Sequence, residues 1–363
     1  MIEIDHVHFY VNNRVKLRNF LTQKLGFSLI YQKINNDTCT EIVGNNLIFF
    51  VISSALNYTS PVAHYLNSHP SGVADVAFRV SDLNAFINRS DVTVLVPPQE
   101  CFFTGGYLKW ATIKGWDSLS HTLIEKTNFT SSYYLFCEPQ LTTPINFFNP
   151  SSENNYSPLV GIDHLVLNVP RGDLEKAVNW YQNLFNFQVH QTFTIQTKYS
   201  GLFSKVLRSP DCKINFNINE PTSANSQIQE FLEANRGAGI QHIALQSTNL
   251  LQIIKHLRYL GVSFLSTPKT YYTQLKQQGR YGELASITEQ EWEALETAQI
   301  LVDWAKKKPQ SLLLQIFTEP IFDEPTFFFE FIERRSSAQG FGEGNFRALF
   351  EAIEKDQMKR DKL

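Results

Sequence analysis

The chain has 363 residues, of which 43% are hydrophobic, and a formal net charge of −3. This length is typical of two globular domains, and the hydrophobic fraction is sufficient for an ordinary buried core. The small net charge and the lack of any Lys/Arg-rich run argue against a nucleic-acid partner.

The N-terminus and the hydrophobic runs give no sign of secretion or of a membrane span. The opening residues, MIEIDHVHFYV, lack a basic region, a long apolar stretch and a small-residue cleavage site. No window reaches about 18 uninterrupted apolar residues, the length that a membrane-spanning helix needs. Cys39, Cys101, Cys137 and Cys212 are far apart and form no CxxC pair. We therefore expect a cytoplasmic protein with no membrane partner and no disulfide framework.

Two short segments of the chain have similar sequences. Residues 4–11 read IDHVHFYV, and residues 162–169 read IDHLVLNV. Both alternate between apolar and polar positions, as half-buried strands do. Each is followed by a helical pattern and an aromatic turn, which includes Phe27 in the first half and Phe187 in the second.

A second pair of similar segments lies further along each half. Residues 60–80 (SPVAHYLNSHPSGVADVAFRV) and 226–246 (SQIQEFLEANRGAGIQHIALQ) each predict a short helix, a glycine-containing turn and a strand. When they are aligned with a slip of one residue, Asp75 falls opposite His242. A repeat of this length indicates duplicated domains and not a solenoid. We therefore predict an α+β fold with curved sheets and two similar strand-and-helix units in each half.

The boundary between the halves is predicted in the segment NFFNPSSENNYSP (146–158), which is polar and rich in turn formers. We accordingly assign residues 1–150 to the first domain and 151–363 to the second. The first would be a structural domain without metal, and the second would contain the functional site and end in a helix.

The segment 274–310 interrupts the repeated pattern. Ser286 and Thr288 are candidate N-terminal caps for a helix from about Glu289 to Gln299. We therefore predict an inserted helical excursion before the last strands.

Three polar residues of the second half form a candidate metal site. His164 lies in the first strand of this half, His242 in the matching strand of the next unit, and Glu330 in the apolar strand PTFFFEFIERR (325–335). An ionised Glu is almost never fully buried without a partner, so Glu330 requires a metal, an Arg or a proton. Two imidazoles and one carboxylate are the usual ligands of non-haem iron(II) oxygenases. The set therefore predicts an iron(II) site, although each residue alone is more commonly an ordinary core or strand-edge residue.

The first half provides a comparison for this site. Its residues at the corresponding positions are His6, Asp75 and Thr122. Because Thr122 is a poor iron ligand, this set is incomplete. We therefore expect His6 and His8 to be strand histidines with local partners, in a copy of the fold that supports the second half.

Several longer segments of the second half match a known family in sequence and in order. They include GIDHLVLNV (161–169), SQIQEFLEANRGAGIQHIAL (226–245), LLLQIFTEP (312–320), PTFFFEFIERR (325–335) and GFGEGNFRALFEAIE (340–354). Through these segments the chain resembles the 4-hydroxyphenylpyruvate dioxygenase family of the vicinal oxygen chelate superfamily. The N-terminal half resembles the first domain of that family more loosely, mainly in IDHVHFYV and GVADVAF.

The resemblance implies a fold, a cofactor and a reaction. The fold would be two tandem vicinal oxygen chelate domains, each of paired βαβββ modules that form an open, curved eight-stranded sheet. Fe(2+) would bind His164, His242 and Glu330. The enzyme would convert 4-hydroxyphenylpyruvate and O2 to homogentisate and CO2, in tyrosine catabolism and in plastoquinone or tocopherol precursor supply. Its partners would be this aromatic keto acid and O2, and we also expect a homo-oligomer.

The resemblance also implies a substrate pocket. Its polar side would contain the catalytic glutamines Gln227, Gln241 and Gln315 and the substrate-binding residues Ser204 and Asn219. Its remaining substrate-binding residues would be Asn345 and the aromatic residues Phe317, Phe328, Phe346 and Phe350. Taken alone, strand glutamines are usually solvated, and phenylalanines are usually core residues.

The C-terminal segment has Phe346, Leu349, Phe350 and Ile353 at helical spacing, so they share one apolar helix face. Core packing alone explains such a face. The family implies in addition that this helix closes the pocket as a lid.

One departure from the family lies close to the pocket. Asn217 in NINEP (217–221) occupies a position where the family usually has proline. The change leaves the predicted iron site intact and affects only the expected shape of the pocket wall.

Three alternative functions remain open. A 4-hydroxymandelate synthase has the same fold, metal and substrate but hydroxylates the benzylic carbon. Asn219 and Phe328 favour attack on the ring, and a product assay distinguishes the two enzymes. An extradiol dioxygenase needs an acid–base histidine, and the C-terminal segments argue against it. A non-catalytic ligand-binding relative would not need an intact triad, and an iron assay tests this alternative.

Overall fold

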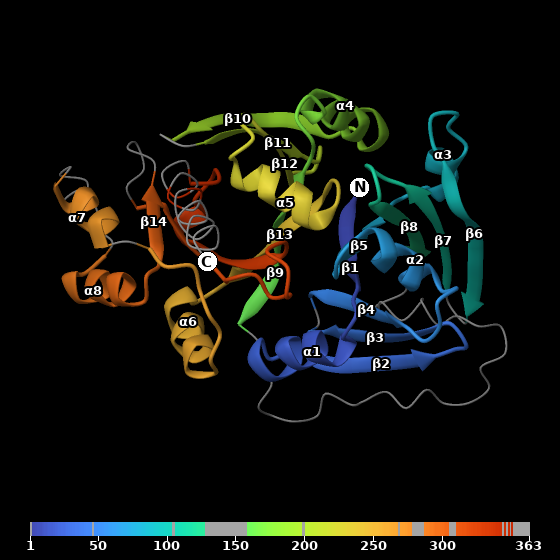
Figure 1. Cartoon of the computed structure of the whole chain (residues 1–363), viewed down its shortest axis with the longest axis horizontal. Coiled ribbons are helices and arrows are strands. Elements are labelled where there is room, and N and C mark those ends of the chain that lie inside the picture. The colour runs from blue at the N-terminus through green and yellow to red at the C-terminus, as the bar shows by residue number, and fades with distance from the viewer. Residues whose placement is uncertain are drawn as a thin grey trace.

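Two eight-stranded sheets, one from each half of the chain, make up the molecule (Figure 1). This computed structural model describes residues 2–127, 158–277 and 287–350, without residues 46, 104–105, 198–199, 268, 305–309, 343–344, 346–347 and 349. The two sheets and their helices confirm the predicted α+β fold, with paired strand-and-helix units in each half.

The first sheet has the strand order β2-β3-β4-β1-β5-β8-β7-β6. Its strands are β1 (Glu3–Tyr10), β2 (Ser28–Ile34), β3 (Thr38–Gly44), β4 (Phe49–Ala55), β5 (Gly72–Arg79), β6 (Val94–Phe103), β7 (Gly106–Lys114) and β8 (Ser120–Thr127). The helices of this half are α1 (Arg14–Asn19), the π-helical turn η1 (Phe20–Lys24), α2 (Pro61–Ser68) and α3 (Leu83–Ile87).

The second sheet has the order β10-β11-β12-β9-β13-β16-β15-β14, which repeats the first order strand by strand. Its strands are β9 (Leu159–Asn168), β10 (Gln188–Gln196), β11 (Gly201–Arg208), β12 (Asn215–Pro221), β13 (Gly239–Ser247), β14 (Leu301–Trp304), β15 (Leu312–Phe317) and β16 (Phe328–Arg334). Its helices are α4 (Leu174–Phe185), α5 (Gln227–Asn235), α6 (Leu250–Tyr259), α7 (Lys269–Gln277), α8 (Glu289–Thr297) and the short 3-10 helix η4 (Arg335–Ser337).

The predicted local elements agree with these bounds. The one-residue slip between the repeats has a structural cause, because α2 has eight residues and α5 has nine. The inserted helix is α8, and the hydroxyl of Thr288 caps it by accepting a hydrogen bond from the Glu291 amide at 3.2 Å. Ser286 and the predicted linker 146–157 lie outside the described residues. The sequence analysis did not identify α7.

Alternation along the strands separates a core face from a second face in each sheet. On β9, Leu165 and Leu167 belong to the main hydrophobic core, whereas His164 and Asn168 point to the other side. We call this second side of each sheet the inner face. Smaller apolar clusters in the second half, such as the one that contains Phe317 and Phe328, lie apart from the main core.

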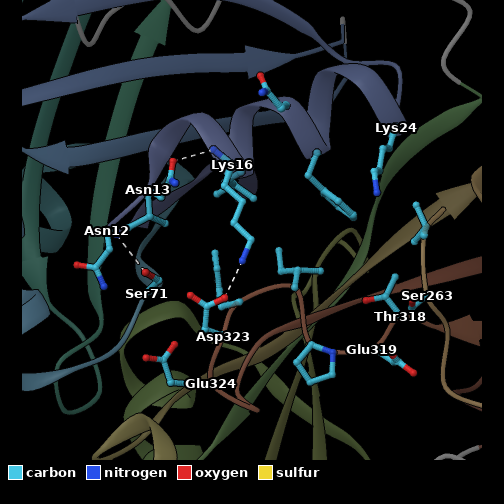
Figure 2. Close-up of a pocket in the computed structure, with 18 of the residues that line it drawn as sticks. Asn12, Asn13, Lys16, Lys24, Ser71, Ser263, Thr318, Glu319, Asp323 and Glu324 are labelled. Carbon is cyan, nitrogen blue, oxygen red and sulfur yellow. Dashed lines mark hydrogen bonds and ion pairs between the residues drawn. The ribbon is translucent and has the colours of Figure 1, made fainter. Parts of the chain in front are cut away.

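The two halves pack against each other through the main core. The ring of Phe78 lies 5.0 Å from that of Phe185, and the hydroxyl of Tyr181 is 3.0 Å from Nε2 of His121. A cavity of about 490 Å³ separates α1 and η1 from the loop 318–324. Figure 2 shows the ion pair that spans this cavity, in which Lys16 Nζ lies 2.7 Å from Asp323 Oδ1.

No helix in the described part of the chain is long and apolar enough to cross a membrane. Cys39, Cys101 and Cys212 are free thiols. Cys137 lies outside the described residues.

Candidate metal centre and substrate pocket

The three predicted metal ligands converge on the inner face of the second sheet. His164, His242 and Glu330 lie on β9, β13 and β16, which are neighbouring strands. Glu330 Oε2 is 3.2 Å from His164 Nε2 and 3.6 Å from His242 Nε2. All three side chains are buried, and their candidate ligand atoms lie within 4.8 Å of one another.

The spacing of these atoms fits a divalent metal ion. Metal–nitrogen and metal–oxygen bonds of about 2.0–2.2 Å place neighbouring ligand atoms about 3 Å apart. The two Nε2–Oε2 distances are close to that value. Two imidazoles and one carboxylate on one side of an ion leave its other side open for further ligands.

The electrostatics of the cluster favour one positive charge next to Glu330. Burial alone would lower the pKa of His164, but the carboxylates of Glu330 and Asp163 outweigh it and raise that pKa to about 9. Burial, together with the neighbouring His164, holds the pKa of His242 well below its usual value. A metal ion can supply the positive charge and use the neutral Nε2 atoms as ligands.

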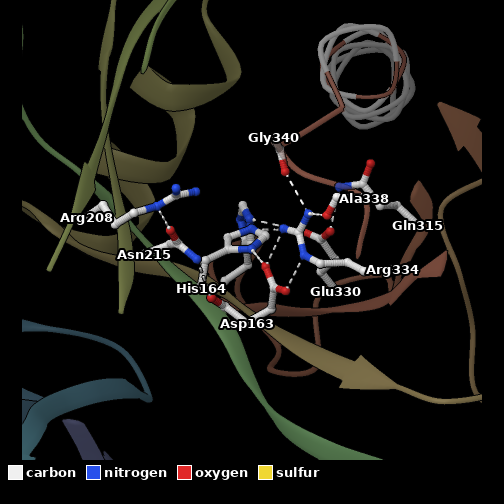
Figure 3. A network of polar contacts seen from close by, with 10 residues as sticks. Asp163, His164, Arg208, Asn215, Gln315, Glu330, Arg334, Ala338 and Gly340 are labelled. Carbon is white, nitrogen blue, oxygen red and sulfur yellow. Dashed lines mark hydrogen bonds and ion pairs between the residues drawn. The ribbon is translucent and has the colours of Figure 1, made fainter. Parts of the chain in front are cut away.

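A buried hydrogen-bond network orients His164 (Figure 3). Asp163 Oδ1 lies 2.9 Å from His164 Nδ1, and Arg334 donates to both carboxylate oxygens of Asp163 at 2.6 and 2.7 Å. Burial would raise the pKa of Asp163, but Arg334 and His164 hold it far below its usual range. The ionised carboxylate favours a proton on Nδ1 and so leaves Nε2 free to bind a metal.

A second network orients Glu330. Gln315 donates from Nε2 to Glu330 Oε1 at 2.8 Å, and Asn345 donates from Nδ2 to Gln315 Oε1 at 2.8 Å. Tyr271 donates its hydroxyl to Asn345 Oδ1 at 2.7 Å. These bonds hold Oε1 and leave Oε2 facing the two histidines. The structure thus places Gln315 and Asn345 beside the metal ligands.

The remaining predicted polar residues lie on strands of the same sheet, except Gln227, which lies on α5. Gln241 donates from Nε2 to Gln227 Oε1 at 2.9 Å, and both side chains are buried. Ser204, Asn219 and Asn168 form a row across β11, β12 and β9. Each has a buried atom without a hydrogen-bond partner among the described residues, namely Ser204 Oγ, Asn219 Oδ1 and Asn168 Nδ2. Unpaired buried polar atoms are rare in proteins, so the row is suited to binding a polar ligand or water.

Aromatic rings surround the metal ligands. The ring of Phe328 stacks on that of His242 at 4.7 Å, and Phe317 meets Phe328 edge-on at 6.3 Å. Phe341, which the sequence analysis did not single out, meets His164 edge-on at 5.4 Å. Phe350 is buried in a cluster with residues of β10, β11 and α5. Phe346, Leu349 and Ile353 lie outside the described residues.

The sequence analysis also missed Asp163, Arg334 and Asn168. One signal for Asp163 was present, because an Asp-His pair occurs in both repeats, as Asp5-His6 and as Asp163-His164. In the first half, Asp5 Oδ1 lies 3.2 Å from His6 Nδ1, and the corresponding atoms of the second half are 2.9 Å apart.

The strand register confirms the predicted alignment of the first half with the metal ligands. Asp75 pairs with His8 and Ser120, just as His242 pairs with Val166 and Phe328. Thr122, two residues after Ser120, is therefore the counterpart of Glu330.

The first-half histidines have local contacts, as predicted. His8 Nε2 lies 2.8 Å from the Ser53 hydroxyl. Burial, together with His6, lowers the pKa of His8 to about 3. In the described part of the chain, the only group of three potential metal ligands is His164, His242 and Glu330.

Comparisons with known proteins agree with this fold. Residues 161–279 match the model of the Glyoxalase/Bleomycin resistance protein/Dioxygenase superfamily. The 4-hydroxyphenylpyruvate dioxygenase of Yarrowia lipolytica is 35% identical, and the alignment covers 99% of this chain and 93% of the relative. An uncharacterised protein of Synechocystis sp. is 34% identical over 97% of each chain.

A solved structure has the same fold over nearly the whole chain. It is a mutant of 4-hydroxymandelate synthase from Streptomyces coelicolor, with 25% sequence identity, 98% of each chain covered and a TM-score of 0.81. The 4-hydroxyphenylpyruvate dioxygenase of Danio rerio is 34% identical, and the alignment covers 100% of this chain and 92% of the relative. The chain therefore belongs to the 4-hydroxyphenylpyruvate dioxygenase family.

Proposed function

We propose that the protein is an iron(II)-dependent dioxygenase that converts 4-hydroxyphenylpyruvate and O2 to homogentisate and CO2. The observation that carries this proposal is the buried group of two histidines and one glutamate on the inner face of the second sheet. Such a ligand set with open positions is typical of non-haem iron(II) oxygenases. The enzymes named for this reaction that cover nearly the whole chain support the choice of substrate.

His164, His242 and Glu330 would hold the iron. When bound, iron(II) supplies a template for the keto acid and a redox centre for its reaction with O2. Asp163 holds His164 in the tautomer that presents Nε2, and Gln315 holds Glu330 through Oε1. These contacts fix the geometry of the ligands before substrate arrives, which lowers the cost of reorganisation during the reaction.

The other inner-face residues would bind and orient the substrate. Phe328 and Phe317 provide aromatic surfaces for its ring by offset or edge-on contact. The unpaired atoms of Ser204, Asn219 and Asn168 can hydrogen-bond its polar groups. These interactions would hold the keto acid in one orientation relative to the metal ligands.

The glutamine pair and the C-terminal helix would complete the pocket. Gln227 and Gln241 hold each other's amides in place by their mutual hydrogen bond, so that the remaining donors and acceptors are oriented. Phe350 and Phe346 would keep water out of the pocket during the reaction.

The direct test is a product assay. The full chain is loaded with iron(II) under anaerobic conditions, mixed with 4-hydroxyphenylpyruvate and exposed to air, and the products are identified by mass and retention time. The proposal predicts homogentisate and one CO2 for each substrate consumed. A metal-loaded protein that leaves the keto acid unchanged would contradict it.

The second candidate function is 4-hydroxymandelate synthesis. We consider this function because the chain is similar to the solved 4-hydroxymandelate synthase mutant over 98% of each chain. Hydroxymandelate in place of homogentisate in the same assay would establish this alternative. Homo-oligomer formation and a role in tyrosine catabolism stay predictions of the proposal.

A further inference from the structure

The segment that follows β16 contacts the residues that support the metal ligands. Arg334, the last residue of β16, donates from Nη1 to the carbonyl oxygens of Ala338 and Gly340 at 3.2 and 2.8 Å (Figure 3). Through Nε and Nη2 the same guanidinium binds Asp163. One side chain thus joins the carboxylate behind His164 to the chain segment that leads to Asn345.

Other contacts bring the same segment close to both ligands. The Phe341 ring lies edge-on to the His164 ring, and the Arg334 guanidinium lies 5.9 Å from the centroid of the Phe341 ring. Gly342 has φ +68°, and a Cβ there would lie 2.5 Å from Gln315 Oε1, so its backbone packs directly on that amide. Asn345 donates to the same oxygen. We call residues 338–342 together with Asn345 the strap.

We propose that Arg334 is a positioning residue that couples metal binding at His164 to docking of the strap. This inference rests on the metal centre proposed above and adds a function that the ligand set does not require. The guanidinium has five N–H donors in a rigid, planar fork, so it can bind a carboxylate and two carbonyls at once. It makes all of these contacts only when the strap is docked.

The coupling acts through the orientation of His164. Partners behind a metal-binding histidine fix its ring and tautomer, and their loss typically weakens metal binding about 10–100-fold. Docking of the strap holds Arg334 against Asp163, and Asp163 holds His164. By thermodynamic linkage, a bound metal must stabilise the docked strap by the same factor by which docking strengthens metal binding.

The first half contains a matched control for this arrangement. Lys126 occupies the position of Arg334, because it lies four residues after Thr122 as Arg334 lies four residues after Glu330. Its Nζ lies 2.9 Å from Asp5 Oδ2, and Asp5 contacts His6. A lysine ammonium binds as a single point and lacks the fork of arginine. A lysine in place of Arg334 can therefore bind either Asp163 or the carbonyl groups of the strap, but not both at once.

The experiment uses anaerobic full-length protein without metal and Co2+ as the probe. Co2+ affinity is measured from its visible absorption, and amide hydrogen exchange is followed in residues 338–342 with and without Co2+. In the unmodified chain, Co2+ should slow exchange in the strap. Arg334→Met should weaken Co2+ binding about 10–100-fold and abolish this protection. Lys126→Met should change neither measurement.

The variant Arg334→Lys distinguishes the contact with Asp163 from the contacts with the strap. It should still hold Asp163, so Co2+ affinity should fall only by the few-fold that docking of the strap contributes, and Co2+ should no longer protect the strap. If Arg334→Met fails to fold, this variant and the unmodified chain decide the question. The inference is wrong if Arg334→Met binds Co2+ normally, or if Arg334→Lys retains the metal-dependent protection. If the unmodified chain binds no Co2+, the metal centre itself is wrong, and the coupling fails with it.

Discussion

The two halves of the molecule have the same strand order and register but different chemistry on their inner faces. His6 and His164 occupy corresponding positions, and each lies next to an aspartate. The other two metal-ligand positions differ, because His242 and Glu330 correspond to Asp75 and Thr122. The fold therefore provides two equivalent inner faces, which differ in two of the three candidate metal-ligand positions.

In the first half, neutral donors hold one oxygen of the buried Asp75 carboxylate, and Oδ1 has no hydrogen-bond partner among the described residues. Ser120 and Thr122 donate their hydroxyls to Asp75 Oδ2 at 2.7 and 3.1 Å. In the second half, Glu330 Oε1 likewise accepts from a neutral donor, Gln315, whereas Oε2 faces two imidazole nitrogens, which can donate to it only when they carry a proton. Neutral donors offset the desolvation of a carboxylate, whereas acceptor-rich surroundings require a cation. We place the metal in the second half because there two imidazole nitrogens and a carboxylate oxygen converge on one point.

The largest expected effect is the loss of metal in Glu330→Ala. This change removes the only negative ligand, so iron content should fall from about one per chain to near zero, and turnover should be abolished. The matched variant Thr122→Ala should retain both. Metal analysis and the product assay measure the two effects. Full iron occupancy in Glu330→Ala would show that the metal lies elsewhere.

Two histidine variants test the same comparison between the halves. His164→Ala should lose iron and activity while the circular dichroism of the fold is preserved. His6→Ala, at the corresponding position of the first half, should bind iron normally. Loss of metal in His6→Ala would contradict the view that the first half is a copy without a metal site.

A smaller, specific effect is expected for Phe350→Ala. Phe350 packs with Ile195, Leu202 and residues of α5, apart from the main core. If it acts through the lid, its removal should admit water, lower kcat/KM and release more CO2 than aromatic product. Chemical denaturation should shift only modestly, whereas Phe216→Ala in the main core should cost about 3–5 kcal/mol. Early unfolding with one-to-one coupling would identify Phe350 as ordinary core.

The glutamine pair should have a moderate effect. Gln241→Leu removes the hydrogen bond to Gln227 and should lower kcat/KM about two- to tenfold, in line with about 0.5–1.5 kcal/mol for such a bond. Gln227→Leu should cause a similar loss, and the double variant should lose less than the two single losses combined. Strictly additive losses in steady-state kinetics would mean that the two amides act independently.

The smallest effect is expected at Asn217. Its Oδ1 is buried without a partner among the described residues. Its counterpart in the first half is Val51, because Asn217 pairs with Val166 as Val51 pairs with His8. Asn217→Val should therefore leave the free energy of unfolding within about 1 kcal/mol or raise it. Urea denaturation measures this change. A loss above about 2 kcal/mol would indicate a bound partner at Oδ1.

The fold was largely predictable from the sequence because the same alternation occurs in both repeats. The apolar positions of residues 4–11 and 162–169 determined the face to which His6 and His164 point. The repeats also provided the correspondence of Asp75 with His242, which the strand register confirms. Roles of individual pocket residues stay predictions, because they depend on substrate contacts.

The supports of the metal ligands were less predictable. Asp163 and Arg334 are 171 residues apart in the chain, and their bidentate contact depends on the packing of β9 near β16. Phe341 and Gly342 follow a short turn whose path has no periodic signal. Helix α7 has a low content of apolar residues in its sequence KTYYTQLKQ, and no similar segment in the first half indicated it.

The central claim is that metal binds in the second half and not in the first. Crystals grown anaerobically with iron(II) and measured at the iron absorption edge test it most directly. We predict one anomalous peak per chain, between His164 Nε2, His242 Nε2 and Glu330 Oε2. A peak beside His6 and Asp75, or none at the three predicted ligands, would contradict the account.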